Sequence, residues 1–413
     1  MPGTPAGQQL AWMLTLLNSG RAPTEAELQA HFSEVFLNTV PSSTLTLELA
    51  QIETEGPFHY AGLEGSSTDF QLVALLDGAA GASFRMAIDV AAVSPYLIEG
   101  LFIRVAAKKG ATWRTVVQML SKEAGHPSIL AAEVRKGRLK TIRAFHPTRT
   151  GAIGSAFKLY VLGALATAIE SGKARWQEKL AIREAWKSIS TGVLQDAPAG
   201  KRFSLKYYTQ RMIASSDNTA ADHLIRRLGR RAVEKASLRL GDHAARRNAP
   251  LLTTREAFVL KLDAPAGLVR AYVRAGSKTR RHLLKRVDAI PLSTAGVVWN
   301  KPRFIDRIEW FASPADLGRA MVGLQRLARK PKLAPIRAIL SKNPGVPIDV
   351  KVWRYVAYKG GSEPGVLAFS WYLQRRDGRA FVLAIVLNDP RREIDLFPAL
   401  SAAESALALL ARS

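Results

Sequence analysis

The chain of 413 residues contains no cysteine. This absence excludes disulfide bridges, a thiolate nucleophile and cysteine-ligated metals. It leaves the redox compartment open, because a chain without cysteine suits reducing and oxidising surroundings equally. The seven histidines show no paired spacing of the kind that holds a metal ion, so we expect no metal site and no cofactor. Stability must therefore come from the burial of apolar side chains.

Long apolar runs are missing too. The apolar stretch 10–17 ends at the polar residues 18–20, and no basic residue precedes it. It therefore fits neither the core of an export signal nor a membrane span, and we expect no integral membrane segment. A signal trimmed from a longer precursor would leave no trace, so the compartment stays open: periplasmic or secreted after such trimming, and otherwise cytoplasmic.

Basic residues are scarce only at the start of the chain. Residues 1–100 contain Arg21 and Arg85 against 11 acidic residues, whereas the whole chain carries a formal net charge of +25. Two basic runs, 226–247 and 270–286, contain few aromatic residues on which bases could stack. We therefore expect these cations to coat solvent-facing helix surfaces, and we expect no nucleic-acid partner. The length and this division of charge predict more than one domain.

The first part of the chain predicts a small α+β domain. Helical patterns are followed by short apolar runs typical of strands. The helices are expected at 8–17 and 24–37, and the strands at 45–52, 70–76, 83–90 and 101–106. We interpret 1–110 as a cystatin-like or steroid-isomerase-like α+β domain, and 111–125 as a connection that contains a helix at 113–123.

The remainder, 126–413, predicts an antiparallel sheet flanked by helices. An early hairpin is separated from a late hairpin by a mainly helical region, and the late hairpin turns at Asp377-Gly378. The early strands are expected at 128–134 and 139–145, a long apolar helix at 155–171, the late strands at 366–373 and 379–387, and a last helix at 393–410. The two ends of this region should pair within one sheet.

The first candidate site is a serine followed by a lysine three residues later. Ser155 and Lys158 lie at the start of the long apolar helix, so their side chains should share one face about 5 to 6 Å apart. A buried amine whose pKa is lowered can take the proton of a serine hydroxyl as that hydroxyl attacks. The helix N-terminus would favour an oxyanion there. The alternative is a serine that only caps the helix.

Two further segments carry polar groups. Ser216, Asp217 and Asn218 lie between a helix that ends near 214 and another that begins near 219. They either point a hydroxyl and an amide into a cleft or cap the second helix.

The other segment follows a strand-like run at 350–358. Lys359 adds a cation there, Gly360 and Gly361 let a substrate backbone approach, and the N–H group of Ser362 can donate to an oxyanion. Because Lys-x-Gly also occurs at 108–110, this element identifies nothing by itself.

In their order and setting, these three motifs resemble those of class A β-lactamases and penicillin-binding proteins. The third motif of that family usually reads Lys-Thr-Gly, so Gly360 replaces a threonine. The resemblance covers about 126–413, and its flanking segments are 152–162, 212–228 and 313–320. It implies a β-lactamase/transpeptidase-like fold and a small-molecule acyl substrate, and we expect a monomer.

The resemblance also implies roles for individual residues. Ser155 corresponds to the nucleophile that becomes acylated and Lys158 to its general base. Ser216 corresponds to the hydroxyl that passes a proton to the leaving group. Asn218 corresponds to the amide that holds a substrate carbonyl, and Lys359 to the cation that attracts a substrate carboxylate.

Two N–H groups complete the family's site. Those of Ser155 and Ser362 correspond to the oxyanion hole, beside which Gly361 leaves room for the substrate backbone.

One family element has no match. Class A β-lactamases hydrolyse the acyl-enzyme with a loop glutamate in a Glu-x-x-Leu-Asn setting, which is missing between 218 and 313, where a basic insertion at about 226–300 lies. Glu256 is a possible deacylation base, although a first-turn helix acid after a threonine cap is the favoured reading. Glu309 is a second candidate, which we expect instead on an exposed face.

The pairing of a small α+β domain with this catalytic domain resembles a narrower group. It is the two-domain β-lactamase-like cephalosporin esterase of the clavulanic-acid gene cluster, and related actinobacterial lipoproteins. The segments 251–256 and 309–314 carry this likeness. We therefore expect a serine hydrolase that forms an acyl-enzyme on Ser155 and acts on β-lactam-like amides or esters. The alternatives are a D,D-peptidase-like penicillin-binding protein, or a non-catalytic protein that binds peptidoglycan or a partner.

Overall fold

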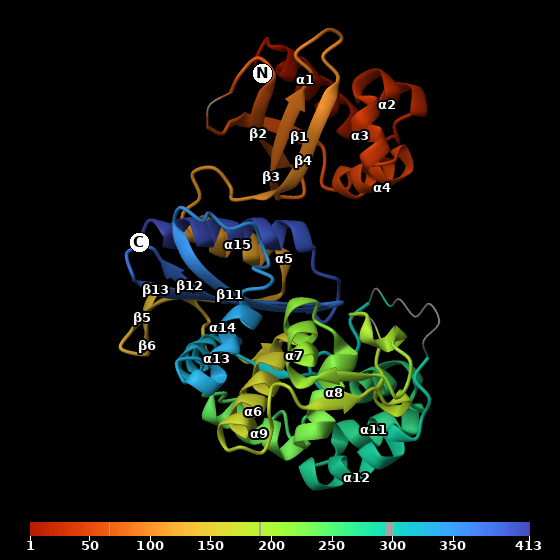
Figure 1. Ribbon diagram of the computed structural model, residues 1–413, viewed down its shortest axis with the longest axis vertical. Helices are drawn as coiled ribbons and strands as arrows, with labels where there is room; N and C mark the ends of the chain where they lie inside the picture. The colour runs from red at the N-terminus through yellow and green to blue at the C-terminus, as the bar shows by residue number, and fades with distance from the viewer. Residues whose placement is uncertain (66, 190, 294–298, 300) are drawn as a thin grey trace. The chain divides into compact units, whose positions relative to one another are not determined.

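The computed structural model describes residues 1–65, 67–189, 191–293, 299 and 301–413 (Figure 1). The chain forms two compact units. The first consists of Met1–Leu120 together with Asp395–Ser413, and the second of Ser121–Ile394. The boundaries 1–110, 111–125 and 126–413 derived from the sequence stay a prediction. No helix in the described ranges combines the length and the apolar character needed to cross a membrane.

Among the described residues, five helices lie entirely within the first unit. They are α1 (Pro5–Leu17), α2 (Glu25–His31), α3 (Glu34–Thr39), α4 (Ser42–Glu53) and α15 (Leu396–Ala411). The helix predicted at 24–37 is in fact α2 and α3, because Phe32 is extended and the Ser33 hydroxyl caps α3 by accepting from the Phe36 N–H group.

The strand predicted at 45–52 is wrong, since these residues lie in α4. Alternating leucines at 45, 47 and 49 suggested a strand. The buried pair Leu45 and Leu49, however, also lies one helical turn apart, and the chain uses that spacing.

The sheet of the first unit is an antiparallel meander in the order β1-β2-β3-β4. Its strands are β1 (Phe58–Leu63), β2 (Gln71–Gly78), β3 (Ser83–Val90) and β4 (Ile98–Ala106). Alternate residues of β3, Phe84, Met86 and Ile88, are buried and share a core with Leu10 and Met13 of α1. The predicted α+β class is confirmed, and β1 is the strand that the sequence did not indicate.

The second unit is built on a five-stranded antiparallel sheet in the order β11-β12-β13-β5-β6. The strands are β5 (His126–Arg135), β6 (Arg138–Phe145), β11 (Trp353–Glu363), β12 (Val366–Arg375) and β13 (Ala380–Asn388). Strand β13 pairs with β5 from Phe381 opposite Glu133 to Asn388 opposite His126. The predicted pairing of early and late segments is therefore confirmed, and β11 is an edge strand.

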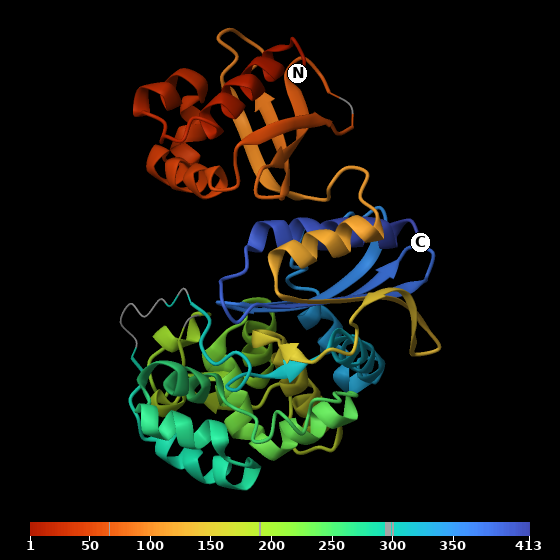
Figure 2. The ribbon, with the colours of Figure 1, turned by 180° about the vertical axis from the view of Figure 1, so that it is seen from behind.

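The longer helices of the second unit lie on one side of this sheet, as the two opposite views in Figures 1 and 2 show. The main ones are α6 (Lys158–Glu170), α7 (Leu205–Ala214), α8 (Asn218–Leu228), α9 (Arg230–Arg239), α13 (Pro314–Leu327) and α14 (Pro335–Leu340). Helix α13 packs on β12, β13 and β5. Most residues of α6 are buried, which explains why that helix is apolar nearly all round.

Shorter elements complete the described chain. They are α5 (Trp113–Glu123), β7 (Gly151–Ala152), β8 (Lys179–Ala181), β9 (Arg202–Ser204), α10 (Thr254–Phe258), α11 (Ala266–Arg274), α12 (Ser277–Asp288) and β10 (Phe311–Ala312). Turns of 3-10 or π type lie at Gly154–Phe157, Glu184–Trp186, Leu194–Asp196, Val259–Asp263 and Pro331–Leu333.

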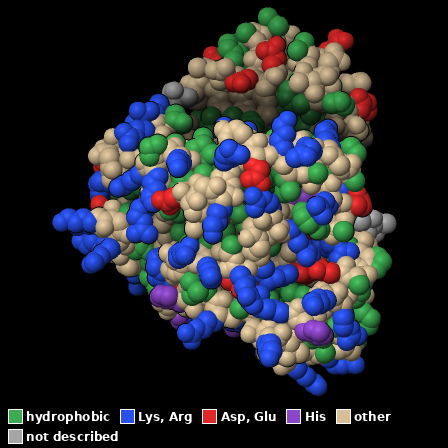
Figure 3. All heavy atoms as spheres, turned by 60° about the horizontal axis from the view of Figure 1, so that its bottom comes forward, with side chains coloured by type: hydrophobic (Ala, Val, Ile, Leu, Met, Phe, Trp, Pro, Cys, Tyr) green, Lys and Arg blue, Asp and Glu red, His purple; other side chains and the backbone are tan. Residues whose placement is uncertain are grey.

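The basic insertion at about 226–300 folds into α9 to α12, and its residues 294–298 and 300 lie outside the described ranges. On α11 and α12 the apolar side chains Leu268, Tyr272 and Leu284 are buried, whereas Arg270 and Arg286 are exposed. The face shown in Figure 3 carries many Lys and Arg side chains and few acidic ones. The cations of the second basic run therefore lie mostly toward solvent.

Candidate active site

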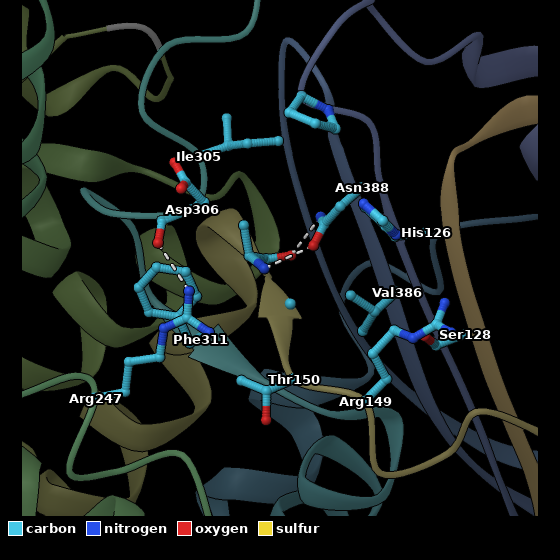
Figure 4. Close-up of a pocket in the computed structure, with 13 residues that line it drawn as sticks. His126, Ser128, Arg149, Thr150, Arg247, Ile305, Asp306, Phe311, Val386 and Asn388 are labelled. Carbon is cyan, nitrogen blue, oxygen red and sulfur yellow. Dashed lines mark hydrogen bonds between the residues drawn. The ribbon is translucent and has the colours of Figure 1, made fainter.

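The backbone that leads to Ser155 is held from both sides. Strand β7 pairs with β10, with Ala152 opposite Phe311. The Asn388 side chain accepts from the Ala152 N–H group at 2.8 Å and donates to its carbonyl at 3.0 Å, as Figure 4 shows at the edge of a small pocket. That pocket has a volume of about 150 Å³ and is lined by none of the predicted catalytic residues. Asn388, which lines this pocket, anchors β7 through its two hydrogen bonds to Ala152.

Ser155 and Lys158 meet as the spacing predicts. Ser155 lies half-buried in the 3-10 turn Gly154–Phe157, and Lys158 begins α6 and is fully buried. The Lys158 Nζ lies 2.9 Å from Ser155 Oγ, 3.2 Å from Ser216 Oγ and 2.6 Å from Asn218 Oδ1. It also contacts the Ser216 carbonyl oxygen at 2.5 Å. One amine therefore connects two hydroxyl groups from different parts of the chain.

The electrostatic setting of Lys158 favours a neutral amine. Burial, and secondarily the nearby cation of Lys359, hold the pKa of Lys158 well below its usual value. A neutral amine 2.9 Å from a serine hydroxyl can accept its proton.

Ser216 and Asp217 make different contacts within the segment 216–218. Ser216 has a φ of +57°, in the left-handed region that non-glycine residues rarely adopt. Asp217 is the N-cap of α8, since its Oδ1 accepts from the Ala220 N–H group at 2.7 Å. The capping alternative thus holds for Asp217, while the Ser216 hydroxyl faces Lys158.

Asn218 is engaged within the protein at both ends of its amide. Its Oδ1 accepts from Lys158 at 2.6 Å, and its Nδ2 donates to the Ile189 carbonyl at 2.7 Å. The role of Asn218 in holding a substrate carbonyl stays a prediction.

Lys359 completes the set. The sequence placed it at the tail of a strand, but β11 continues to Glu363, so Lys359 lies within the strand. Its Nζ lies 3.1 Å from Ser216 Oγ and 2.5 Å from the Gly360 carbonyl. Burial lowers the pKa of Lys359 to about 7. Two hydroxyls and two amines from three distant segments therefore form one continuous chain of contacts.

Close approach of β11 to the turn 154–157 brings two N–H groups together. A Cβ atom on Gly361 would lie 2.5 Å from the Ser155 nitrogen and 2.2 Å from the Ile153 carbonyl oxygen. A Cβ atom on Gly154 would lie 3.1 Å from the Ser362 nitrogen. Glycine is needed at both positions, and the backbones of Ser155 and Ser362 are neighbours, as an oxyanion hole requires.

Glu256 has the arrangement of a helix-capping acid. It forms a capping box with Thr253 at the start of α10, and its carboxylate accepts from Arg230 at 2.6 and 2.9 Å. Burial raises the pKa of Glu256, but the charge and hydrogen bonds of Arg230 outweigh burial and hold the pKa below its usual value. The Glu256 side chain pairs with Arg230, Arg226 and the Thr253 N–H group, and not with Ser155 or Lys158.

The expectation that Glu309 lies on an exposed face is wrong. Glu309 is buried at 5% exposure. Strand β10 begins two residues later, at Phe311, and backbone N–H groups hold the Glu309 carboxylate in the interior. Its Oε2 accepts from the Gly154 N–H group at 3.2 Å and from the Trp310 N–H group at 3.0 Å, and Lys261 lies 3.1 Å from its Oε1. Sequence reasoning missed Lys261; the only local signal was a lysine inside the apolar run 257–262.

Titratable side chains offer little for a metal. Across the ranges that the structure covers, no group of three or more His, Asp or Glu side chains is arranged to hold an ion. The hydroxyls and amines of Ser155, Lys158, Ser216 and Lys359 can perform nucleophilic attack and proton transfer.

An antiparallel sheet with helices on its face, and a serine and lysine at the start of a buried helix, define a β-lactamase/transpeptidase-like fold. Residues 111–412 match the model of the Beta-lactamase enzyme family, and the chain belongs to that family. Residues 1–94 match a second model, described as ORF 12 gene product N-terminal.

Two solved structures are similar to this chain. One is a β-lactamase from Sphaerobacter thermophilus, with 20% identity and a TM-score of 0.51, covering 73% of this chain and 97% of that one. The other is a variant of the class A β-lactamase of the last common ancestor of Gram-negative bacteria, with 15% identity and a TM-score of 0.50, covering 72% and 97%. Together with the family match, these likenesses show a class A β-lactamase-like fold. A comparison with curated proteins finds no match.

Proposed function

We propose that the chain is a serine hydrolase that forms an acyl-enzyme on Ser155 and acts on β-lactam-like amides or esters. The observation that carries this proposal is the unbroken series of contacts from Ser155 Oγ to Lys158 Nζ at 2.9 Å, on to Ser216 Oγ at 3.2 Å, and on to Lys359 Nζ at 3.1 Å. A protein that only binds a ligand would have no need of two hydroxyls and two buried amines in this order.

Acylation begins with proton transfer. Neutral Lys158 takes the proton of Ser155 as Oγ bonds to the substrate carbonyl carbon, and the carbonyl oxygen becomes an oxyanion. The N–H groups of Ser155 and Ser362 donate to that oxyanion. The proton then passes from Lys158 through Ser216 to the leaving nitrogen or oxygen as its bond to carbon breaks. Lys359 favours this relay, because a cation beside Ser216 lowers the affinity of that hydroxyl for its proton.

Hydrolysis of the acyl-enzyme needs a water molecule and a base. Water bonds to the acyl carbon, its proton returns to Ser155, and the acid leaves. Glu256, the glutamate proposed from the sequence, is bound to Arg230 at 2.6 Å and caps α10. This engagement favours slow deacylation, as in a D,D-peptidase-like penicillin-binding protein, and makes that activity our second candidate.

Intact-protein mass spectrometry with a panel of β-lactams and acetate esters tests the proposal. The wild-type protein should gain the mass of the acyl group, Ser155→Ala should gain none, and the exposed neighbour of the site, Ser215→Ala, should react like the wild type. Adducts that persist for minutes would favour the penicillin-binding candidate over rapid hydrolysis. Neither adduct nor hydrolysis with any donor would overturn the proposal in favour of a non-catalytic binding protein.

A further inference from the structure

Three charged side chains lie buried directly behind the candidate oxyanion hole. They are Lys261, Glu309 and Glu363, here called the Lys–Glu–Glu cluster, and their side chains are 1%, 0% and 9% exposed. The Lys261 Nζ lies 3.1 Å from Glu309 Oε1 and 2.5 Å from Glu363 Oε1. None of the three takes part in the acylation steps described above.

Each carboxylate of the cluster is attached to one half of the oxyanion hole. Glu309 Oε2 accepts from the N–H group of Gly154, directly before Ser155, at 3.2 Å. Glu363 directly follows Ser362 in β11. Lys261, from the π-helical turn Val259–Asp263, therefore links the turn that carries one N–H group to the strand that carries the other.

Stability alone does not account for such a cluster. Removing charged side chains from water is costly, and well-packed apolar replacements of buried ion pairs are often neutral or stabilising. Gly154 has a φ of +46°, so its N–H group does not point in the direction that it would have in a regular helix. The Glu309 carboxylate satisfies that N–H group and fixes the turn. The geometry that the cluster maintains is thus the geometry of the hole.

We propose that Lys261, Glu309 and Glu363 are positioning residues that hold the N–H groups of Ser155 and Ser362 at the separation required to bind an oxyanion. This inference rests on the proposed function. It assigns the cluster no contact with the substrate: the cluster acts through the backbone at Gly154 and at the end of β11. Burial, followed by the charge of Glu309, raises the pKa of Glu363 well above its usual value.

Glu309→Gln and Lys261→Met test the inference, with Glu234→Gln as a matched control. Glu234 resembles Glu309 in its contacts, because one of its oxygens accepts from the Leu251 N–H group at 3.0 Å and the other pairs with Arg281 at 2.5 Å. It contacts neither half of the hole. The acylation rate constant of Ser155 with an activated ester, the apparent KM and the affinity for phenylboronic acid, which forms a tetrahedral adduct, would be measured for each variant.

Displacing the donors of an oxyanion hole affects the transition state more than the ground state. We expect Glu309→Gln and Lys261→Met to lower the acylation rate constant about 10- to 100-fold, with a parallel loss of boronate affinity and little change in KM. Glu234→Gln should match the wild type in all three quantities, even if its melting temperature falls. If Lys261→Met does not fold, Glu363→Gln, which is close in shape, takes its place.

The outcomes separate this inference from the proposed function. If wild-type Ser155 is not acylated by any donor, the proposed function fails. If the wild type is acylated and the cluster variants react as fast as Glu234→Gln, the proposed function stands and the positioning role is overturned. A loss of stability without a loss of boronate affinity would likewise overturn it, because a merely structural cluster would give that result.

Discussion

Lys158 and Lys359 approach the same oxygen atom, the hydroxyl of Ser216, from two different elements. Their Nζ atoms lie 3.2 and 3.1 Å from Ser216 Oγ. Two ammonium groups at such distances from one atom repel each other, and both are buried, so the fold favours their neutral forms. The burial that would make Lys158 useful as a base therefore lowers the stability of the folded protein at any pH at which the two amines are charged.

Lys359→Met should stabilise the protein while it abolishes acylation, and the gain should depend on pH. The pKa of Lys359 is about 7 in the folded protein, lowered by burial, whereas an unfolded lysine keeps its ordinary value near 10.5. Between these values the unfolded chain binds more protons, so wild-type stability rises with pH. The advantage of the variant should be largest near pH 6 and shrink as the pH rises from about 7 to about 10, by up to about 1.4 kcal/mol per unit.

Denaturant unfolding at pH 6 and pH 9 measures this difference. Lys351→Met, at an exposed position before β11, is the control. An advantage of Lys359→Met that is equal at both pH values would show that Lys359 remains charged when folded.

Comparing Ser216→Gly with Ser216→Ala distinguishes the effect of the Ser216 hydroxyl on acylation from the effect of its backbone conformation on stability. Both remove the hydroxyl, so both should slow acylation by about 100-fold or more, if the proton relay contributes as general acid–base groups usually do. Only glycine adopts a φ of +57° without strain, so the glycine variant should be more stable than the alanine variant by about 1 kcal/mol. Stopped-flow acylation and thermal unfolding give the two quantities. Equal stabilities would contradict the strain, and unchanged rates would contradict the relay.

Glu256→Gln should change stability and leave turnover unaltered. The substitution leaves the Arg230 guanidinium without its charged partner in a largely buried position, which should cost about 3 kcal/mol. Glu178→Gln is the matched control. Glu178 pairs with Arg227 at 2.6 and 3.1 Å, but this pair lies closer to solvent. The control substitution should therefore lower the free energy of unfolding by less than about 1 kcal/mol. An acyl-enzyme that accumulates in Glu256→Gln alone would instead identify Glu256 as the deacylation base.

Gly361→Ala should impair acylation by pushing β11 away from Ser155. The new methyl group would meet the Ile153 carbonyl oxygen at 2.2 Å and the Ser155 nitrogen at 2.5 Å, and neither backbone atom can move alone. We expect at least about a 100-fold loss of the acylation rate constant, because the donors of an oxyanion hole tolerate little displacement. Gly276→Ala, where a Cβ atom meets nothing within 4 Å, should behave as the wild type. A fully active Gly361→Ala would contradict the assignment of the hole.

The sequence predicts those parts of the molecule in which a local pattern and the final contacts agree. The helix Trp113–Glu123 and the strand Ser83–Val90 were expected within these bounds, because their periodicity is strong and turn residues flank them. Ser155 and Lys158 were expected to meet because three residues span about one helical turn. At 45–52 two periodicities fitted the same leucines, and the local pattern could not decide between them.

The sequence contains no comparable local pattern for contacts between distant segments. Lys261 lies 48 residues before Glu309 and 102 before Glu363. No spacing rule connects them, and a lone lysine in an apolar run does not reveal its partners. Glu309 was expected on an exposed face for the same reason, since two of the partners that hold it in the interior, the Gly154 N–H group and the Lys261 amine, come from elsewhere in the chain. Such clusters become visible only when the tertiary structure is known.

The antiparallel pairing of β5 with β13 has a consequence for biosynthesis. Strand β5 of the five-stranded sheet leaves the ribosome long before Ala380–Asn388, its neighbour on one side, has been synthesised. Until then the edge of β5 that pairs with β13 has unpaired backbone N–H and C=O groups, and the apolar side chains of β5 lack this neighbour. The segment between β5 and β13, which must form a closed loop for the two strands to pair, is long. Translation must therefore be nearly complete before the sheet can assemble. Nascent chains stalled before residue 380 should be the ones that depend most on chaperones and aggregate most readily.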